Sequence, residues 1–294
     1  MLSILIPTYN YNAYPLAKEI EKQAIASNTI FEIICIDDGS NSPINVENQK
    51  INTLKNSVFI ENNQNIGSLG TRVKLASKAN YNWLLFLDAD TFPKNHDFLS
   101  NYLKEIPNSY DAFFGGFAYK KSSYSLNKSL RYTFGKQREE VCASIRNKTP
   151  YKIIISANFL IKKTVYLKLN KNHLDNNYGM DYLLGSLLKT KQIKVKHINN
   201  EVYHYGLDDN YKYLEKTKRA VETLAGLYLN NKIPENNISL IKAYQKIKNL
   251  RLHYLFGKLV AIFNKPIEKN LKSHSPSLFL FDLYRLGYFC KITS

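Results

Sequence analysis

Residues 2–10 of the chain have the sequence LSILIPTYN, a short apolar run that ends abruptly in polar residues. Three further apolar runs follow, at 31–36, 57–60 and 83–87. Between the runs, apolar residues recur every three to four positions at 14–26 and 68–79, which indicates helices. Near-continuous apolar strands that alternate with helices are typical of a parallel sheet covered on both faces. The sequence therefore predicts an α/β domain of the nucleotide-binding type.

Polar side chains follow three of these strands at the points where the strands end. Pro7-Thr8-Tyr9-Asn10 follows the first strand, Asp37-Asp38-Gly39-Ser40 the second, and Asp88-Ala89-Asp90 the fourth. Ligands of an open parallel sheet bind beyond the carboxyl ends of its strands, so we expect the three segments to form one site. Two carboxylate clusters on one rim repel each other unless a cation lies between them.

Asp88 and Asp90 form the most specific local signal. Carboxylates two positions apart at a strand end can reach the same cation, and hard oxygen ligands suit Mg²⁺ or Mn²⁺, which also binds substrate phosphates. The alternative is an Asp that caps the following helix. Asp37 and Asp38 likewise have two interpretations: a plain turn, or acceptors for a nucleobase or a ribose hydroxyl, with Tyr9 stacked on the base.

Four blocks in the first third of the chain resemble family 2 glycosyltransferases with the GT-A fold, in order and in spacing. They are Ile4–Asn10, Ile36–Ser40, Asn65–Gly67 followed by Arg72, and Phe86–Asp90. Ser156–Lys163 resembles the family's acceptor-side strand, and Tyr178–Asp181 before a Leu-rich helix resembles its catalytic Glu-Asp block. The resemblance extends from residue 2 to about residue 225. It implies a GT-A type nucleotide-binding domain with a mostly parallel central sheet.

The resemblance also implies an inverting transfer of one sugar from a nucleotide diphosphate sugar to an acceptor hydroxyl. The acceptor would be a glycan or a lipid-linked molecule of cell-surface polysaccharide or lipid-linked oligosaccharide synthesis. Polymerising relatives usually carry a Gln-x-x-Arg-Trp block and membrane-spanning helices. Trp83 is the only tryptophan and precedes the paired aspartates, so that block is absent and we expect one sugar per reaction.

Individual residues acquire roles from the same resemblance. The nucleotide would be bound from the strand ends and the third-block helix by Pro7, Thr8, Tyr9, Asn10, Asp37, Asp38, Gly67, Arg72 and Asp88. Asp38 is favoured over Asp37 as the residue that binds the base. Asp90 would be the principal ligand of a divalent cation, Mn²⁺ or Mg²⁺, with Asp88 and His204 as further metal ligands. Asp181 would be the catalytic base.

Asp181, Arg72 and His204 each have an alternative interpretation without a role in catalysis or binding. Asp181 lies in a first helical turn, where an Asp can serve simply as a favourable partner of the helix dipole. The same dipole would keep its carboxylate ionised, so as a base Asp181 would depend on its position and not on strong basicity. Arg72 can be an exposed helix residue or a bidentate phosphate ligand. His204 can be a surface histidine. Met180 departs from the family, whose members usually carry an acidic residue there. This difference can alter how the acceptor or the leaving diphosphate is bound.

We expect a catalytic domain over residues 1–208, with a donor half of about 1–110 and an acceptor half of about 111–208, and a basic helical extension over 209–294. Apolar patterns beyond residue 150 predict further elements at 153–155 (strand), 193–195 and 201–204 (a strand pair), 209–263 (two long helices broken near Ile233-Pro234) and 277–290 (an apolar, aromatic and basic segment).

The formal net charge of +17 indicates an anionic partner. Residues 231–294 hold 11 Lys and Arg against 3 Asp and Glu, so the last fifth of the chain carries nearly half of the excess. This distribution favours an anionic membrane surface or a diphosphate substrate over nucleic acid, for which no module is recognisable. The apolar positions between the lysines of 240–255 can anchor the chain to lipid or pack on the catalytic domain, and the basic face can simply contact water.

Several classes of protein are excluded or disfavoured. The longest apolar runs are about five residues, and a membrane span needs roughly 20. No basic region precedes the first strand, so we expect no signal peptide, and the three cysteines lack metal-ligand spacing. We therefore expect a cytoplasmic protein, either free or peripheral at the inner face of the cell membrane.

Two rival functions stay open at this stage. A metal-dependent sugar nucleotidyltransferase shares the fold and the paired Asp, although such enzymes have a Gly-rich basic loop where this chain has Pro-Thr-Tyr-Asn. A catalytically degenerate basic protein that binds membrane or nucleic acid is the second. A P-loop is absent, which disfavours a nucleotide hydrolase.

Overall fold

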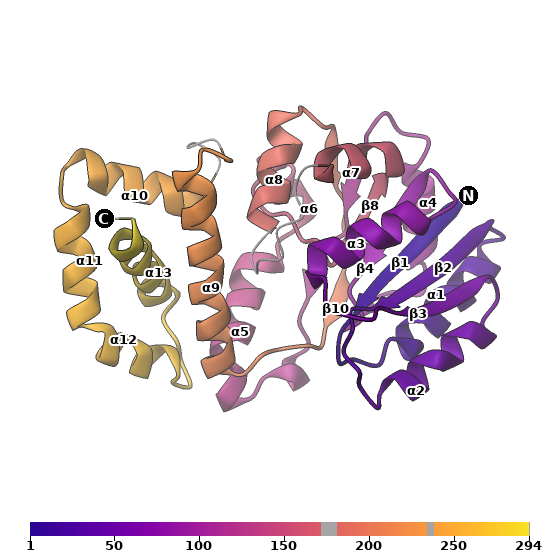
Figure 1. The fold of residues 1–294 in the computed structure, drawn as a ribbon, viewed down its shortest axis with the longest axis horizontal. Coiled ribbons are helices and arrows are strands. Elements are labelled where there is room, and N and C mark those ends of the chain that lie inside the picture. The colour runs from indigo at the N-terminus through magenta and orange to yellow at the C-terminus, as the bar shows by residue number, and fades with distance from the viewer. Residues whose placement is uncertain (172–180, 234–237, 294) are drawn as a thin grey trace. The chain divides into compact units, whose positions relative to one another are not determined.

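The computed structural model describes residues 1–171, 181–233 and 238–293. Contacts between residues divide the chain into two compact units, coloured by residue number in Figure 1. The first unit contains residues 1–118, 141–176 and 191–206, and the second contains residues 119–140, 177–190 and 207–294.

A seven-stranded sheet forms the centre of the first unit. Its strands, in the order β3-β2-β1-β4-β8-β6-β9, are Ser57–Glu61, Phe31–Asp37, Leu2–Thr8, Trp83–Leu87, Asn158–Lys162, Ala112–Phe114 and Val195–His197. The first four are parallel to one another, and β8 runs antiparallel to both β4 and β6. The predicted fold class, an α/β fold with a mostly parallel sheet and a helical C-terminal part, is confirmed, as are the four predicted N-terminal strands.

Helices cover both faces of this sheet. They are α1 (Tyr14–Ala26), α2 (Asn45–Asn48), α3 (Gly67–Lys78), α4 (Phe98–Glu105), α6 (Ala143–Arg146) and α7 (Lys163–Asn170), with a 3₁₀ turn at Gln49–Thr53. The chain passes from β1 to β2 in one direction along the sheet and from β3 to β4 in the other. Right-handed crossovers therefore place α1 and α3 on opposite faces. Accordingly α1 contacts α4, whereas α3 contacts α7.

Aromatic side chains fill the core beneath β4, β8 and β6. Phe159 lies between Phe86 and Phe114, stacked at 4.8 Å and 5.4 Å between ring centroids. These strands are buried along nearly their whole length, which explains their continuous apolar sequence. The apolar stretch Ile153–Ile155 was expected to form a strand, but the strand begins only at Asn158.

A second, three-stranded sheet in the same unit has the order β5-β10-β7, made of Thr91–Pro93, Val202–His204 and Phe117–Ala118. The predicted pairing of the strands near 193–195 and 201–204 is therefore wrong. Strands do form close to these positions, but β9 pairs with β6 in the large sheet and β10 pairs with β5 and β7.

The second unit is helical. Its helices are α5 (Ser129–Phe134), α8 (Asp181–Thr190), α9 (Asn210–Leu229), α10 (Ser239–Asn249), α11 (His253–Ile262), α12 (Asn264–Leu271) and α13 (Leu278–Ile292), with short turns at Lys121–Ser123, Leu126–Lys128 and Gly135–Glu139. Figure 1 shows α9 to α12 arranged around α13, which contacts all four. The Asp209 carboxylate caps α9 by accepting a hydrogen bond from the Lys212 N–H at 2.9 Å.

The second long helix expected from the sequence is in fact two helices. α10 ends at Asn249 and α11 begins at His253, and Arg251 between them has a left-handed φ of 59°. Ile241 and Tyr244 on α10 are buried in the core of the helical unit, so the apolar face of this helix packs against its neighbours. None of the helices that the structure describes is both long and apolar enough to cross a bilayer.

The Arg146 guanidinium stabilises the edge of the large sheet through hydrogen bonds. This side chain is only 1% exposed and donates hydrogen bonds to four carbonyl oxygens, those of Phe114, Gly115, Val141 and Ile198. Its Nη1 also lies 2.8 Å from Nδ1 of His197. Because a guanidinium can only donate, Nδ1 must accept.

His197 is consequently held as the neutral tautomer with its proton on Nε2. That nitrogen donates to the Pro150 carbonyl oxygen at 2.8 Å. Burial lowers the pKa of His197 to about 4, and the nearby Arg146 charge acts in the same direction. Protonation of Nδ1 would remove the acceptor and place two cations together.

We predict that acid destabilises the protein through His197. The unfolded chain binds the proton near the ordinary pKa of about 6.5 and the folded chain only near 4, so this stability is present above pH 6.5 and is lost toward pH 4. Between pH 7.5 and pH 5 the loss should be about 2 kcal/mol in the free energy of urea unfolding. A His197→Gln variant should lack this part of the pH dependence, and an unchanged pH slope in the variant would contradict the assignment.

Candidate functional site

The strand register brings the polar strand ends to one rim of the large sheet. Thr8, the last residue of β1, lies opposite Asp37, the last residue of β2. On the other side of β1, Leu5 lies opposite Phe86, and extending this parallel register places Asp88 level with Pro7. The three segments singled out from the sequence therefore leave the sheet at the same edge.

The first segment presents an aromatic ring at this rim. Tyr9 is 53% exposed, and Asn10 after it turns the chain with a left-handed φ of 52°. The Thr8 hydroxyl donates a hydrogen bond to the Tyr11 carbonyl at 2.9 Å, and the Asn48 side-chain amide donates to the same oxygen at 3.0 Å. The turn is thus fixed at its base while the Tyr9 ring remains accessible for stacking.

The second segment is a tight turn that only glycine permits. Gly39 has φ 69°, and a Cβ there would lie 2.5 Å from the Gln64 carbonyl carbon. Within this turn Asp37 Oδ2 accepts a hydrogen bond from the Ser40 N–H at 2.8 Å. Asp37 Oδ1 is buried and has no hydrogen-bond partner in the described part of the chain.

Asp38 joins this turn to the start of α3. Its Oδ1 accepts hydrogen bonds from the Thr71 hydroxyl at 2.7 Å and the Ile66 N–H at 2.9 Å. α3 then begins at Gly67, whose φ is 79° and whose N–H donates to the Asn65 side chain at 3.1 Å. The positive end of the α3 dipole consequently lies in the block that was expected to contact the nucleotide.

Arg72 is buried on α3 and forms an ion pair with Asp88. It also donates to the Ser68 hydroxyl and to the Ser68 carbonyl oxygen. The plainer interpretation, an exposed helix residue, does not hold. Arg72 is the cation that compensates Asp88 at this rim.

Asp88 and Asp90 lie in a turn that leads from β4 into β5, so neither caps a helix. The Asp88 N–H donates to the Ala157 carbonyl at 3.1 Å, and the Asp88 carbonyl accepts from both the N–H and the hydroxyl of Thr91. The next helix, α4, begins only at Phe98. The capping alternative is therefore set aside.

Asp90 and His204 are brought together by the small sheet. β10 pairs with β5 so that His204 lies opposite Thr91, and the Tyr205 N–H donates to the Asp90 carbonyl at 2.9 Å. His204 Nε2 then lies 3.3 Å from Asp90 Oδ2. The His204 ring stacks on Phe117 at 4.9 Å with an interplanar angle of 6°, which fixes its orientation.

Two residues near Asp90 were not assigned from the sequence. A Cβ on Gly206 would lie 1.8 Å from Asp90 Oδ2, so this glycine makes room for the carboxylate. Burial raises the pKa of Tyr11, and the negative charge of Asp90 acts in the same direction. The only available signal was their position in the sequence, since Tyr11 directly follows Asn10 and Gly206 lies two residues after His204.

The donor atoms partly fit a divalent cation. Asp90 Oδ2 and His204 Nε2, 3.3 Å apart, can both contact one ion. Asp88 Oδ1 is instead engaged by Arg72. Among the described residues no group of three His, Cys, Asp or Glu side chains is poised to hold a metal. An ion bound by Asp90 and His204 would need further oxygen ligands from water or substrate phosphates, as is usual for Mg²⁺.

The proposed catalytic block lies largely outside the described residues. Tyr178, Gly179 and Met180 are not described, and of Asp181 the structure shows only that it begins α8. Its assignment as the catalytic base therefore stays a prediction.

Comparison with known proteins gives consistent matches. Residues 3–168, more than half of the chain, match the model of glycosyl transferase family 2. A Haemophilus influenzae protein described as an uncharacterized glycosyltransferase is 26% identical over 264 residues, which cover 85% of this chain and 86% of that protein. The crystal structure of S. aureus TarS 1–349 superposes with a TM-score of 0.52 at 17% identity, over 97% of this chain and 89% of that one.

A second structure of S. aureus TarS 1–349, in complex with UDP-GlcNAc, has a TM-score of 0.46 at 17% identity and covers 75% of this chain and 65% of that one. The TarS 1–349 likeness at 0.52 extends over nearly the whole of this chain and shows a shared fold.

We predict that Gly206→Ala weakens binding of Mn²⁺ together with a nucleoside diphosphate by roughly 10- to 100-fold, since the new methyl group forces the Asp90 carboxylate to move. Isothermal titration calorimetry measures this. Gly226→Ala is the matched control, because a Cβ there meets nothing within 4 Å. Equal affinities in the two variants would show that the position of Asp90 does not matter for binding.

Proposed function

Because the chain belongs to glycosyl transferase family 2, we propose that it transfers one sugar from a nucleoside diphosphate sugar to an acceptor hydroxyl, with inversion at the anomeric carbon. The observation that supports this most strongly is the single rim that carries Tyr9, Asp38, Arg72, Asp88 and Asp90. The proposed acceptor is a glycan or a lipid-linked molecule of cell-surface polysaccharide or lipid-linked oligosaccharide synthesis. Family membership sets aside the sugar nucleotidyltransferase alternative.

The nucleoside half of the donor binds at the ends of β1 and β2 in this proposal. The exposed Tyr9 ring stacks on the base. Asp38 Oδ2 accepts no hydrogen bond from any described residue, so it provides an acceptor for N–H or O–H groups of the base or ribose. Asp38 is held rigidly through its other oxygen, so its position is set before the donor binds.

The diphosphate half lies between the start of α3 and the Asp90 turn. The positive end of the α3 dipole, at Gly67, favours negative charge, and Arg72 reduces the repulsion that Asp88 would exert on phosphate. Asp90 and His204 would hold Mn²⁺ or Mg²⁺, with Asp88 reaching it through a water molecule. Such an ion supplies positive charge beside the leaving diphosphate.

Transfer is a single displacement. Asp181 takes the proton of the acceptor hydroxyl as that oxygen forms a bond to the anomeric carbon, on the face opposite the diphosphate. The bond between the anomeric carbon and the phosphate oxygen breaks at the same time, and its electron pair leaves with the nucleoside diphosphate. The remaining advantage comes from holding donor and acceptor in line.

Calorimetric titration with UDP, GDP, dTDP and CDP, with and without Mn²⁺, tests the donor site. We expect one diphosphate to bind in a Mn²⁺-dependent manner, and Asp90→Asn to weaken this binding at least about tenfold because the metal loses its main ligand. Asp97→Asn, at an exposed carboxylate of the same unit, should bind like the parent. If no diphosphate binds, or if Asp90→Asn behaves like Asp97→Asn, the donor site is wrong.

The base is tested separately with Asp181→Asn. We expect the rate of sugar-nucleotide turnover to fall about 10²- to 10⁴-fold, because proton removal is lost, while the dissociation constant of the nucleoside diphosphate stays unchanged. Slow hydrolysis of the donor by water provides an assay without the acceptor. Parent-like turnover in this variant would require another base.

A further inference from the structure

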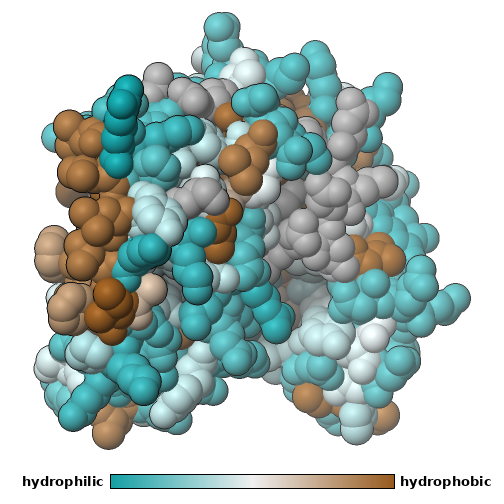
Figure 2. All heavy atoms as spheres, turned by 60° about the vertical axis from the view of Figure 1, so that its left-hand side comes forward, coloured by the Kyte–Doolittle hydropathy of each residue, from teal (hydrophilic) through white to brown (hydrophobic). Residues whose placement is uncertain are grey.

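The helical unit exposes large apolar side chains on and beside α11. Ile262 is 72% exposed and Phe279 69%, and the same class includes Leu250, Leu252, Tyr254, Leu255, Leu259 and Phe263. Figure 2, in which the side of the helical unit comes forward, shows hydrophobic side chains gathered in a band. Contiguous exposed apolar surface of this kind usually marks an interaction site.

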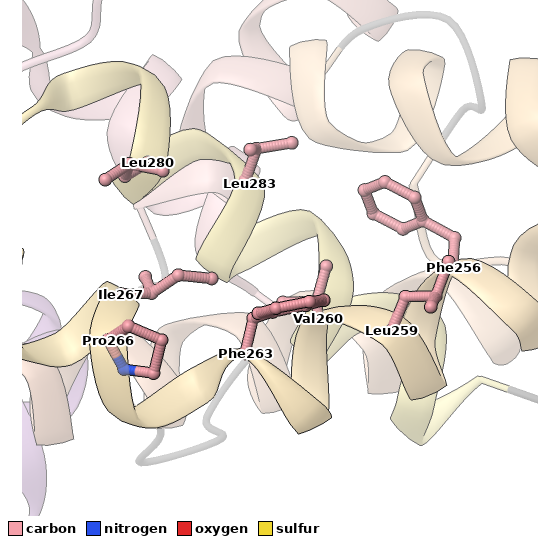
Figure 3. A pocket seen from close by; sticks show the side chains of 8 residues that line it. All are labelled: Phe256, Leu259, Val260, Phe263, Pro266, Ile267, Leu280 and Leu283. Atoms are coloured by element: carbon pink, nitrogen blue, oxygen red, sulfur yellow. The ribbon is translucent and has the colours of Figure 1, made fainter.

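A cavity with hydrocarbon walls opens among α11, α12 and α13 (Figure 3). Its volume is about 420 Å³. Its walls are made of eight apolar side chains: Phe256, Leu259, Val260, Phe263, Pro266, Ile267, Leu280 and Leu283. Leu259 and Phe263 belong both to the walls and to the exposed set, so the cavity is continuous with the apolar surface.

Two lysines on the helices that carry this apolar surface have no carboxylate partner among the described residues. Glu268 and Asp282, the two carboxylates of residues 238–293, already pair with Lys272 and Arg285. In the described part of the chain no ion pair involves Lys258 on α11 or Lys265 on α12, and both are exposed. The Lys258 ammonium lies over the Tyr254 ring at 4.3 Å from its centroid, a pair suited to the lipid interface.

We propose that this surface of α11 and α12, together with the cavity, docks on the anionic leaflet of a membrane, and that the cavity takes one hydrocarbon chain of an anionic phospholipid. α11 has 10 residues and is about 15 Å long, so it lies in the interface instead of spanning the bilayer. Ile262 and Phe263 enter the acyl region, and Lys258 and Lys265 contact lipid phosphates.

The charge argues against a second copy of the chain as the occupant. Two such basic surfaces would repel each other, whereas an anionic bilayer complements both their charge and their apolar side chains. The proposal is independent of donor chemistry, since every residue that carries it belongs to the helical unit. It also differs from an anchor through α10, whose Ile241 and Tyr244 are buried.

Vesicle co-sedimentation tests the docking. We expect binding to vesicles of phosphatidylcholine mixed with phosphatidylglycerol, weak binding to phosphatidylcholine alone, and loss of binding at high salt. The variants Ile262→Asp with Phe263→Asp, and Lys258→Glu with Lys265→Glu, should each lower the partition coefficient at least about tenfold. Val46→Asp is the matched control, because Val46 is as exposed as Ile262, at 72%, but lies in the first unit. Thermal melting checks that each variant folds.

A fluorescence measurement tests the cavity. In a Trp83→Phe background, Leu283→Trp places the only indole in the cavity wall, at a side chain outside the exposed set, and Phe279→Trp places it on the apolar surface outside the wall. Phosphatidylglycerol brominated on its acyl chains should quench Leu283→Trp more strongly. Equal quenching at the two positions would overturn the cavity assignment.

Other outcomes overturn the docking itself. They are absent vesicle binding, equal binding to neutral vesicles, or variants that bind like Val46→Asp. Concentration-dependent self-association of the parent, abolished by Ile262→Asp with Phe263→Asp, would assign the surface to a second copy. Nucleoside diphosphate binding, measured on the same proteins, separates failure of this proposal from failure of the donor site.

Discussion

The parallel pairing of β1 with β2 and with β4 is the constraint on which the proposed donor site depends. Because Thr8 lies opposite Asp37 in this register, two loops rich in hydrogen-bond acceptors leave the sheet side by side. The strands themselves are buried on both faces, so their positions are fixed by core packing. A shift of one residue would exchange the side chains on the two buried faces of β1 and disrupt the packing on both. Side chains attached directly to such strands keep their positions without help from a ligand, as a binding site for a small charged molecule requires.

Compensation of negative charge shapes the rest of the rim. Four carboxylates gather there, and they are stabilised in three ways. Asp37 and Asp38 accept hydrogen bonds from neutral donors, Asp88 pairs with Arg72, and Asp90 lies against His204. The stack of His204 on Phe117 fixes that last contact, and the absence of a side chain at Gly206 leaves room for it. The proposed diphosphate would add further negative charge, and a cation shared by the Asp90 carboxylate and the His204 imidazole would favour its binding there.

The sequence predicted the strands of the donor half well because they are continuous apolar runs, and each end was located within two residues. The contact between Asp90 and His204 depends on strands of only three residues, which carry no recognisable periodicity. Short apolar stretches were also misleading, since Ile153–Ile155 lies in a loop. The division of one predicted helix at Arg251 follows from a left-handed backbone that side-chain spacing does not reveal. Asp181 was assigned from the family resemblance alone, and its side chain lies outside the described residues.

Crystals grown with Mn²⁺ and the nucleoside diphosphate that the protein binds best would test the donor site most directly. Anomalous scattering locates the manganese independently of the protein model. We predict a manganese peak in direct contact with the Asp90 carboxylate, His204 Nε2 and phosphate oxygens of the nucleotide. The base should be stacked on Tyr9. A nucleotide bound away from this rim, or manganese with ligands other than Asp90, would contradict the proposed site.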